Sequence, residues 1–271
     1  MPELKISIGG AAGRMGKRLI ACIHEDAALG LAEAVDNPQH PSLGSDAGTS
    51  SGVDPMGIAV SGNYQIESGT QAVIDFSTPD GATAAIDFCT QHKVPLVMAT
   101  TGLEEEHIAA LKSATDSIPV VWAPSMSLAV NVMMKVTQYV GAALKNLDKV
   151  DVEILERHHR FKVDSPSGTA LKFGQLVAES MGLDKHVHGR EGVVGQRTDN
   201  EIGYHAVRAG DDPGQHTILF GMQGEKIELH VAASNRDCYA LGALAAAKFV
   251  VNQQPGLYDM FDVLGLNDGQ V

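Results

Sequence analysis

The chain has few of the residues that mark disulfide-rich, nucleic-acid-binding or membrane proteins. Its three cysteines, Cys22, Cys89 and Cys238, are odd in number and widely spaced, which fits neither a disulfide framework nor a zinc cluster and suits a reducing cytoplasm. Aromatic residues make up 5% of the sequence, too few for a surface on which nucleic-acid bases stack. No apolar run is long enough to cross a bilayer, and we expect no signal peptide at the N-terminus.

Basic residues are also in short supply. Lys and Arg number 20 against 33 Asp and Glu, so the formal net charge is −13 at pH 7. A chain this acidic is a poor candidate for a nucleic-acid or membrane-surface binder. Its length of 271 residues and its hydrophobic content of 44% indicate a globular enzyme with one large domain or two smaller ones. We therefore expect a cytoplasmic protein with neither nucleic acid nor membrane as a partner.

The first half of the chain alternates short apolar strands with helical segments, which is typical of a parallel sheet. The predicted strands cover residues 4–8, 30–35, 72–76, 95–99 and 120–123. The first predicted helix follows the glycine-rich loop and ends at about residue 24, and two more cover residues 80–92 and 104–114. Residues 37–56 are rich in proline, glycine and serine and are predicted to form a long loop.

The pattern changes after Asn131. A long apolar helix is predicted over 132–147, and strands that alternate in polarity follow at 150–157, 217–220 and 226–232. Alternation indicates a sheet with one packed and one exposed face, and hence a second domain of the α+β type. Residues 184–216 show little periodicity and are expected to form an extended excursion. The apolar helix at 239–251 comes too late to extend this sheet and is expected to return to the first domain.

A glycine-rich segment, Gly10-Ala11-Ala12-Gly13-Arg14-Met15-Gly16, follows the first strand and opens a helix. Glycines there permit a tight turn and close approach of the backbone, and the helix N-terminus presents N–H groups to a pyrophosphate. The spacing is a variant of the usual fingerprint, and an ordinary strand-to-helix turn is the alternative. Asp36 ends the second strand, where an acid binds the adenine-ribose diol or simply caps a loop. Together these features predict a Rossmann dinucleotide-binding domain.

The residues after the second strand also bear on the choice of cofactor. Asp36 and Asn37 would repel a 2′-phosphate, which favours NADH over NADPH, although Arg14 and Lys17 lie close enough to weaken this preference. Two further loops, 76–79 and 99–102, end the third and fourth strands and could orient the nicotinamide. Their threonines could equally cap the helices that follow.

The densest chemistry lies in Glu156–Ala170. His158, His159, Arg160 and Lys162 would repel one another unless an anion compensates them, which predicts an anionic small substrate. Ser167, Gly168 and Thr169 begin a helix, so their N–H groups and hydroxyls form a cradle for a carboxylate. Histidine and lysine are the usual acids for a proton-transfer step. A solvated basic loop is the alternative, and no metal is expected, because adjacent histidines on an extended chain point to opposite faces.

This segment resembles the signature E-x-H-H-x-x-K-x-D-x-P-S-G-T-A of the 4-hydroxy-tetrahydrodipicolinate reductase family, also called dihydrodipicolinate reductase. The resemblance runs from the glycine loop to Gly256–Met260, includes Arg208–His216, and so covers nearly the whole chain. It implies NAD(P)H-dependent reduction of 4-hydroxy-tetrahydrodipicolinate, a small dicarboxylate, to tetrahydrodipicolinate in bacterial and plant lysine and diaminopimelate biosynthesis. It also implies a homotetramer built through the sheets of the second domain.

The resemblance further implies an α/β protein with three parts: a dinucleotide-binding domain (1–127), a substrate-binding and tetramerisation domain with a mixed open sheet (128–236), and a C-terminal segment returning to the first domain (237–271). By resemblance, His158 is a proton donor or acceptor and Lys162 a proton donor. The substrate would contact His159, Ser167, Gly168 and Thr169. The cofactor would contact Gly10, Ala11, Ala12, Gly13, Arg14, Met15, Asp36, Ala99, Thr100, Thr101, Ala123, Pro124, Ser125 and Met126.

The chain departs from the family pattern at cofactor positions. Relatives often carry Glu and a basic residue where Asp36 and Asn37 stand, Ala12 and Ala99 replace common glycines, and Pro124–Met126 replaces Ala-Asn-Phe. Two other functions remain as alternatives. An aspartate-semialdehyde or homoserine dehydrogenase shares the expected domains, but the former would need an active cysteine. An NADH-sensing regulator would not need the paired acids His158 and Lys162.

Overall fold

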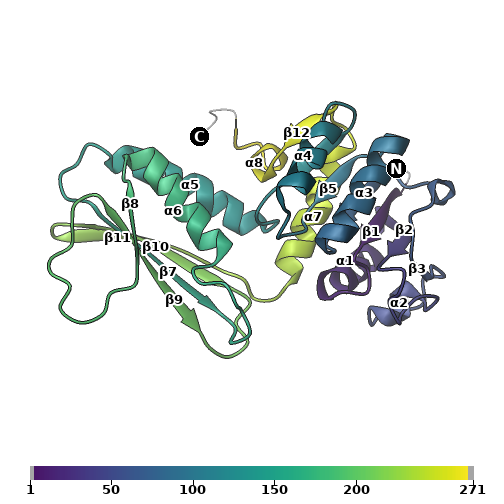
Figure 1. Cartoon of the computed structure of the whole chain (residues 1–271), viewed down its shortest axis with the longest axis horizontal. Coiled ribbons are helices and arrows are strands. Elements are labelled where there is room, and N and C mark those ends of the chain that lie inside the picture. The colour runs from purple at the N-terminus through teal and green to yellow at the C-terminus, as the bar shows by residue number, and fades with distance from the viewer. Residues whose placement is uncertain (1–2, 268–271) are drawn as a thin grey trace. The chain divides into compact units, whose positions relative to one another are not determined.

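The structure is a computed structural model that describes residues 3–267 (Figure 1). Contacts divide the chain into two compact units, one of residues 1–128 with 236–271 and the other of residues 129–235. The domain boundaries expected from the sequence differ from these by one residue each. Among the described residues, no helix combines the length and the apolar character needed to cross a membrane.

The first unit is built on a parallel sheet of seven strands. Its spatial order is β12-β6-β5-β4-β1-β2-β3. The strands are β1 (Leu4–Gly9), β2 (Leu29–Val35), β3 (Val60–Ser61), β4 (Ala72–Asp75), β5 (Leu96–Met98), β6 (Pro119–Trp122) and β12 (Gly256–Tyr258). The chain runs outward in one direction from β1 to β3 and in the other from β4 to β12, so the strand order switches between β1 and β4. Open α/β sheets bind ligands at the carboxyl ends of strands beside such a switch.

Helices form separate apolar cores with the two faces of this sheet. The helices are α1 (Arg14–Glu25), α2 (Ala47–Ser50), α3 (Pro79–His92), α4 (Glu105–Ala114), α7 (Asp237–Val250) and α8 (Met260–Val263), with the 3-10 turn η1 (Ile66–Ser68). One core joins α1 and α7 to inward residues such as Ile6 and Ile74, and the other joins α3 and α4 to Val73 and Leu96. The expected Rossmann architecture is confirmed.

The C-terminal helix α7 packs within the first unit because its residues are small. Ala240, Ala243 and Ala247 are completely buried, which lets the helix approach the sheet closely. A Cβ atom at Gly242 would overlap the carbonyl of Met126, so only glycine fits there. The late apolar segment therefore returns to the first unit.

The second unit holds a mixed sheet of five strands in the order β11-β10-β7-β9-β8. The strands are β7 (Asp151–His158), β8 (Lys185–His188), β9 (Glu201–Arg208), β10 (Gln215–Met222) and β11 (Glu225–Ala232), and the helices are α5 (Leu128–Leu144) and α6 (Gly168–Met181). Strands β7, β9 and β8 run parallel, whereas β10 is antiparallel to both β7 and β11. Figure 1 shows α5 and α6 along one face of this sheet. The expected mixed sheet is confirmed.

One sequence-based prediction is wrong in this unit. Residues 184–216, expected as an excursion, contain β8 and β9, and β9 pairs with β7 along seven positions. The first four residues of β9 are all buried, so the strand shows no alternation. Its outward face is covered by the arginine-bearing segment that precedes it: Arg197 donates to the carbonyl of Glu201 at 2.6 Å and Arg190 to the Glu201 carboxylate at 2.8 Å.

Smaller differences concern the ends of helices and one loop. Helix α5 starts at Leu128 and ends at Leu144, several residues earlier at both ends than predicted. The expected loop 37–56 contains the helical turn α2, whose N-cap Asp46 accepts a hydrogen bond from the Thr49 N–H at 2.9 Å. Asp46 also accepts bonds from the N–H groups of Met56 and Gly57, so one carboxylate organises this segment.

Candidate active site

The glycine loop lies at the carboxyl edge of the first sheet. Gly10 has a φ of +73°, and a Cβ atom there would lie 2.5 Å from the Phe76 carbonyl oxygen. At Gly16 a Cβ atom would overlap the carbonyl oxygen of Gly10, so glycine permits α1 to begin directly against the loop. The Ala12 N–H donates to Asp36 at 2.8 Å, and the Asn37 N–H donates to the other oxygen of the same carboxylate. The structure therefore brings the loop and Asp36 together.

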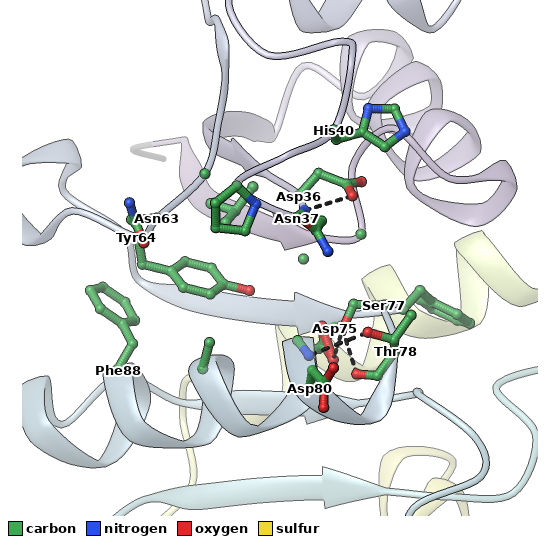
Figure 2. A pocket seen from close by; sticks show the side chains of 18 of the residues that line it. Asp36, Asn37, His40, Asn63, Tyr64, Asp75, Ser77, Thr78, Asp80 and Phe88 are labelled. Carbon is green, nitrogen blue, oxygen red and sulfur yellow. Dashed lines mark hydrogen bonds between the residues drawn. The ribbon is translucent and has the colours of Figure 1, made fainter.

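A cavity of about 570 Å³ opens beside this loop. Gly10, Gly13 and Asp36 line it, together with residues that follow β3 and β4. Figure 2 shows Asp36, Asn37 and His40 on one side and Asp75, Ser77 and Thr78 on the other, with the Tyr64 side chain reaching between them. The ring of Tyr64 stacks on Phe88 with centroids 5.0 Å apart. A flat apolar wall, a glycine loop at a helix N-terminus and an acid at the end of β2 suit a dinucleotide.

Asp75, the last residue of β4, is completely buried in the wall of this cavity. Its Oδ2 accepts hydrogen bonds from the hydroxyls of Ser77 at 2.9 Å and Thr100 at 2.8 Å, and the Ser77 N–H donates to Thr100 Oγ1. The carboxylate thus joins the loop after β4 to the loop after β5. Its Oδ1 is buried without a hydrogen-bond partner. Burial raises the pKa of Asp75 to about 6, because the charged form loses hydration.

This shift makes Asp75 a source of pH-dependent stability. A carboxyl whose pKa is higher in the folded state stabilises the fold fully below its unfolded pKa, and this contribution disappears as the pH rises through about 6. Asp75→Asn mimics the neutral acid. Relative to the wild type, we expect the variant to gain on the order of 3 kcal/mol in unfolding free energy between pH 4 and pH 7. Urea unfolding at a series of pH values measures this, with the exposed Asp116→Asn as control. Parallel pH curves for wild type and Asp75→Asn would contradict the assignment.

The remaining predicted cofactor residues follow β5 and β6 or begin α1. Arg14 is exposed at the start of α1. Residues 99–101 and 123–126 follow β5 and β6 at the same sheet edge, but they do not line the cavity. The side chains of Ala11, Ala99, Ala123 and Met126 belong to the apolar core. At these positions the backbone, and not the side chain, would face a ligand.

Of the two helix caps predicted at threonines, the structure has one. Thr78 caps α3, where its hydroxyl accepts from the Gly81 N–H at 3.4 Å. Thr101 does not cap α4, because Glu104 forms a capping box with His107 there. Glu104, Glu106 and His107 also have the spacing of metal ligands, but they lie at an exposed helix start and are used in the cap, so we assign them no metal.

The histidine–lysine cluster gathers at one end of the second sheet. His158 ends β7 and pairs with Arg208 at the end of β9, while His216 lies at the start of β10. Ser167 caps α6 through a hydrogen bond from the Ala170 N–H, and its hydroxyl lies 3.1 Å from His216 Nε2. Lys162 Nζ pairs with Asp164 at 2.8 Å. The structure therefore brings the predicted residues His158, Lys162 and Ser167 into one cluster.

His159 lies beside this cluster on the loop that follows β7. Its N–H donates to the Asp212 carbonyl at 2.8 Å. Its ring atom Nδ1 is buried and has no hydrogen-bond partner. Because a buried polar atom normally finds a partner, this nitrogen is a candidate contact for a ligand.

Glu156 begins the segment singled out from the sequence, but no role was predicted for it. It is 1% exposed, and one oxygen lies 2.6 Å from His158 Nδ1 while the other accepts the Ser167 N–H at 3.0 Å. The Arg208 guanidinium donates to both oxygens at 2.7 Å. Burial alone would raise the pKa of Glu156, but the bonds from Arg208 and His158 outweigh it and hold this pKa below its usual value.

The two histidines of the cluster are both held towards the neutral form. Burial lowers the pKa of His158, and the hydrogen bond with Glu156 opposes that shift. Burial lowers the pKa of His216 to about 4, with a further contribution from His158, so His216 is uncharged at neutral pH. An uncharged imidazole beside an ionised carboxylate has the arrangement of a proton carrier near neutrality.

A signal for Glu156 is present in the sequence. Glu156 and His158 lie two residues apart on an alternating strand, so both point towards the packed face. A carboxylate on that face needs a cationic partner. The partner Arg208 is distant in sequence, so only the parallel pairing of β7 with β9 could identify it.

The pKa values of the three cysteine thiols test the alternative of an aspartate-semialdehyde dehydrogenase, which would need an active cysteine. Burial raises the pKa of Cys22 and Cys238, and that of Cys89 to well above its usual value. A catalytic cysteine needs a lowered pKa, because the thiolate is the nucleophile. None of the three cysteines has that property.

Comparisons with known proteins agree with this geometry. The family described as "Dihydrodipicolinate reductase, N-terminus" matches residues 4–126, and "Dihydrodipicolinate reductase, C-terminus" matches residues 129–264. A 4-hydroxy-tetrahydrodipicolinate reductase of Rhodopirellula baltica is 55% identical over 272 residues, which cover 98% of this chain and 97% of the relative. A dipicolinate-bound dihydrodipicolinate reductase from Paenisporosarcina sp. TG-14 superposes with a TM-score of 0.73 at 25% identity, covering 96% of this chain and 98% of that one.

These matches define an NAD(P)H-dependent oxidoreductase with a Rossmann domain and a separate mixed-sheet domain. More specifically, the chain belongs to the dihydrodipicolinate reductase family. A probable aspartate-semialdehyde dehydrogenase from Pseudomonas aeruginosa shares the fold, with a TM-score of 0.56, but only 9% of the sequence, over 93% of this chain and 99% of that one. That likeness concerns the fold alone.

Proposed function

We propose that the protein reduces 4-hydroxy-tetrahydrodipicolinate to tetrahydrodipicolinate in diaminopimelate and lysine biosynthesis, with NADH preferred over NADPH. The observation that carries the proposal is the cluster of His158, Lys162 and Ser167 at one end of the second sheet. A relative with 55% identity over nearly the full length carries the corresponding name. Cationic and N–H groups in a net-acidic protein suit a small dicarboxylate.

Each residue of the cluster has a role in this proposal. The N-terminus of α6, with Ser167, Gly168 and Thr169, holds one carboxylate of the substrate by its N–H groups. His159 offers its unpartnered Nδ1 to the same molecule. Lys162 provides positive charge and a proton, and His158 accepts or returns a proton.

The reduction itself needs a hydride and a proton. The substrate would first lose water to give a conjugated cyclic imine. NADH, if held by the glycine loop and Asp36, would supply the hydride that reduces ring carbon 4 of this imine. Electrons then flow to the ring nitrogen and give an enamine, which is protonated at carbon 3. Lys162 or His158 donates that proton. The glycine loop, Asp36 and the loops after β4, β5 and β6 would hold the dinucleotide.

The proposed activity is tested by adding freshly made product of dihydrodipicolinate synthase together with NADH. We expect rapid NADH oxidation. We also expect dipicolinate, a planar dicarboxylate, to raise the melting temperature only when NADH is present. An NADH-sensing regulator would show binding without turnover. Absence of oxidation with either cofactor would contradict the reductase proposal.

The cofactor preference is attributed to the charge of Asp36. The carboxylate would repel a 2′-phosphate, and its two N–H bonds fix it beside the glycine loop. We expect Asp36→Asn to lower the ratio of kcat/KM for NADH over NADPH about tenfold, the size of one ionic interaction of ~1.4 kcal/mol. Steady-state assays with both cofactors measure the ratio, and the exposed Asp54→Asn serves as control. An unchanged ratio in Asp36→Asn would remove the basis for the preference.

The assembly is proposed to be a homotetramer in the cytoplasm, joined through the outward face of the second sheet. Leu155 and Val207 lie on that face and are 38% and 47% exposed, which is high for apolar side chains on central strands. Burial of such a face between copies would remove them from water. Light scattering of the purified protein tests this, and a mass equal to the single chain of 28.6 kDa would contradict it.

A further inference from the structure

We propose that Glu156 and Arg208 are positioning residues that hold His158 in a single tautomer and couple it to the substrate-carboxylate loop. The proposal deepens the function proposed above and rests on it for the role of His158. Neither residue needs to touch the substrate. Their effect would pass through His158 and Ser167.

The carboxylate of Glu156 is surrounded by donors from three elements. His158 lies on the same strand, Arg208 on β9, and Ser167 at the start of α6. Arg208 binds both oxygens, the geometry that gives a guanidinium its strongest and most directional interaction. The same guanidinium donates to the Asp164 carbonyl at 2.6 Å, so it also fixes the loop that carries Lys162.

An ionised Glu156 determines which nitrogen of His158 carries the proton. A carboxylate only accepts hydrogen bonds, so Nδ1 must be the protonated atom at 2.6 Å from it. In the neutral imidazole, Nε2 is then the free base and can exchange a proton with a ligand. A Cβ atom at Gly214 would lie 2.9 Å from Nε2, so any larger residue there would crowd this nitrogen.

The same carboxylate also orients the carboxylate-binding loop. Ser167 donates its N–H to Glu156 and caps α6 with its hydroxyl, which fixes the direction in which the following N–H groups point. A substitution at Glu156 would therefore disturb proton transfer and substrate binding together. The charged or titratable groups around His158 are Glu156 on its own strand, Lys162 on the loop, Arg208 on β9 and His216 on β10.

The tautomer of His158 can be measured in the wild-type protein without any activity. Long-range ¹H–¹⁵N spectra of ¹⁵N-histidine-labelled protein distinguish the Nδ1–H form from the Nε2–H form. We expect the Nδ1–H form for His158, whose signal is assigned by its loss in His158→Gln. A predominant Nε2–H form would overturn the proposal, whether or not the protein reduces the proposed substrate. If instead the tautomer is as expected but no substrate is reduced, the proposed function fails and not the positioning.

The variant Glu156→Gln tests the consequence for catalysis. A neutral amide cannot accept from His158, Ser167 and Arg208 at once, so we expect kcat to fall about 10²-fold. The KM for NADH should stay unchanged. Because Glu156 raises the pKa of His158 against the effect of burial, its loss should lower this pKa and move the limb of the kcat profile that His158 controls to lower pH. Glu156→Asp keeps the charge and should restore part of kcat and of the pH profile.

Matched controls separate positioning from a general loss of structure. Glu179→Gln changes an exposed glutamate on α6 and should alter neither the tautomer nor the pH profile. Arg208→Lys keeps one charge but loses the two-pronged contact, and should give an intermediate kcat. A Glu156→Gln variant with the wild-type pH profile and tautomer, at whatever kcat, would overturn the proposal.

Discussion

Replacing Lys162 with alanine is expected to lower kcat by about 10²–10⁴-fold, the usual cost of losing one acid in a proton-transfer step. The lysine side chain is 23% exposed and pairs with Asp164 at 2.8 Å, so its ammonium group is held at the loop that follows β7. Its positive charge also lowers the pKa of both His158 and His216. Steady-state kinetics with saturating NADH measure the loss.

Binding measurements distinguish this effect from damage to the fold. The affinity for NADH should be unchanged in Lys162→Ala, because the lysine lies in the second unit and the glycine loop in the first. The exposed Lys145→Ala, on the same unit, should keep wild-type kinetics. If Lys162→Ala turns over at nearly the wild-type rate, Lys162 is not the proton donor.

A second large effect is expected from Gly16→Ala. The added methyl group would overlap the Gly10 carbonyl and the Ala11 backbone, and backbone atoms cannot move aside as a flexible side chain can. The loop must then separate from the start of α1, where the N–H groups would meet the pyrophosphate. We expect the Kd for NADH to rise about 10²-fold and the unfolding free energy to fall by about 1–3 kcal/mol, the usual cost of overpacking.

Fluorescence titration with NADH and urea unfolding measure these two quantities. Gly221→Ala is a suitable control. Gly221 lies on β10, and a Cβ atom there would have its nearest neighbour at 3.6 Å, an ordinary van der Waals distance. The kcat of Gly16→Ala at saturating NADH should remain near the wild-type value, since the His158 cluster is in the other unit. Unchanged NADH affinity would contradict the role of this loop in cofactor binding.

The first unit could be predicted from the sequence because its signals are local. Each apolar strand is followed by glycine, proline or a polar cap, and the contact between Ala12 and Asp36 follows from their positions after adjacent strands. The link from Asp75 to Thr100 was not predicted, because it depends on β4 and β5 being neighbours. The sequence around an acid at the end of a buried strand does not identify the side chains that will bind it.

In the second unit, the residues of one local segment could be predicted, whereas those on distant strands could not. His158, Lys162 and Ser167 lie within ten residues of one another and were visible as one segment. Arg208 and His216 contribute to the same cluster only through the pairing of β7 with β9 and β10. The first residues of β9 are all buried and do not alternate in polarity, so its pairing with β7 was not predicted. Arg208 was noted as part of a segment that resembles the family, but no role was predicted for it. Contacts between distant strands are the part that one sequence does not reveal.

Strand β7 presents glutamates to both of its faces. On the packed face Glu156 binds His158 and Arg208. On the other face Glu153 binds His205 and Arg190. Each face thus carries a glutamate that binds one histidine and one arginine. A shift of β7 by one residue against β9 would turn every side chain to the opposite face. It would carry Arg157 inward in place of Glu156. The hydrogen-bond ladder between these strands is thus itself part of the chemistry, and changes of loop length that alter its alignment would abolish activity while leaving every site residue in the chain.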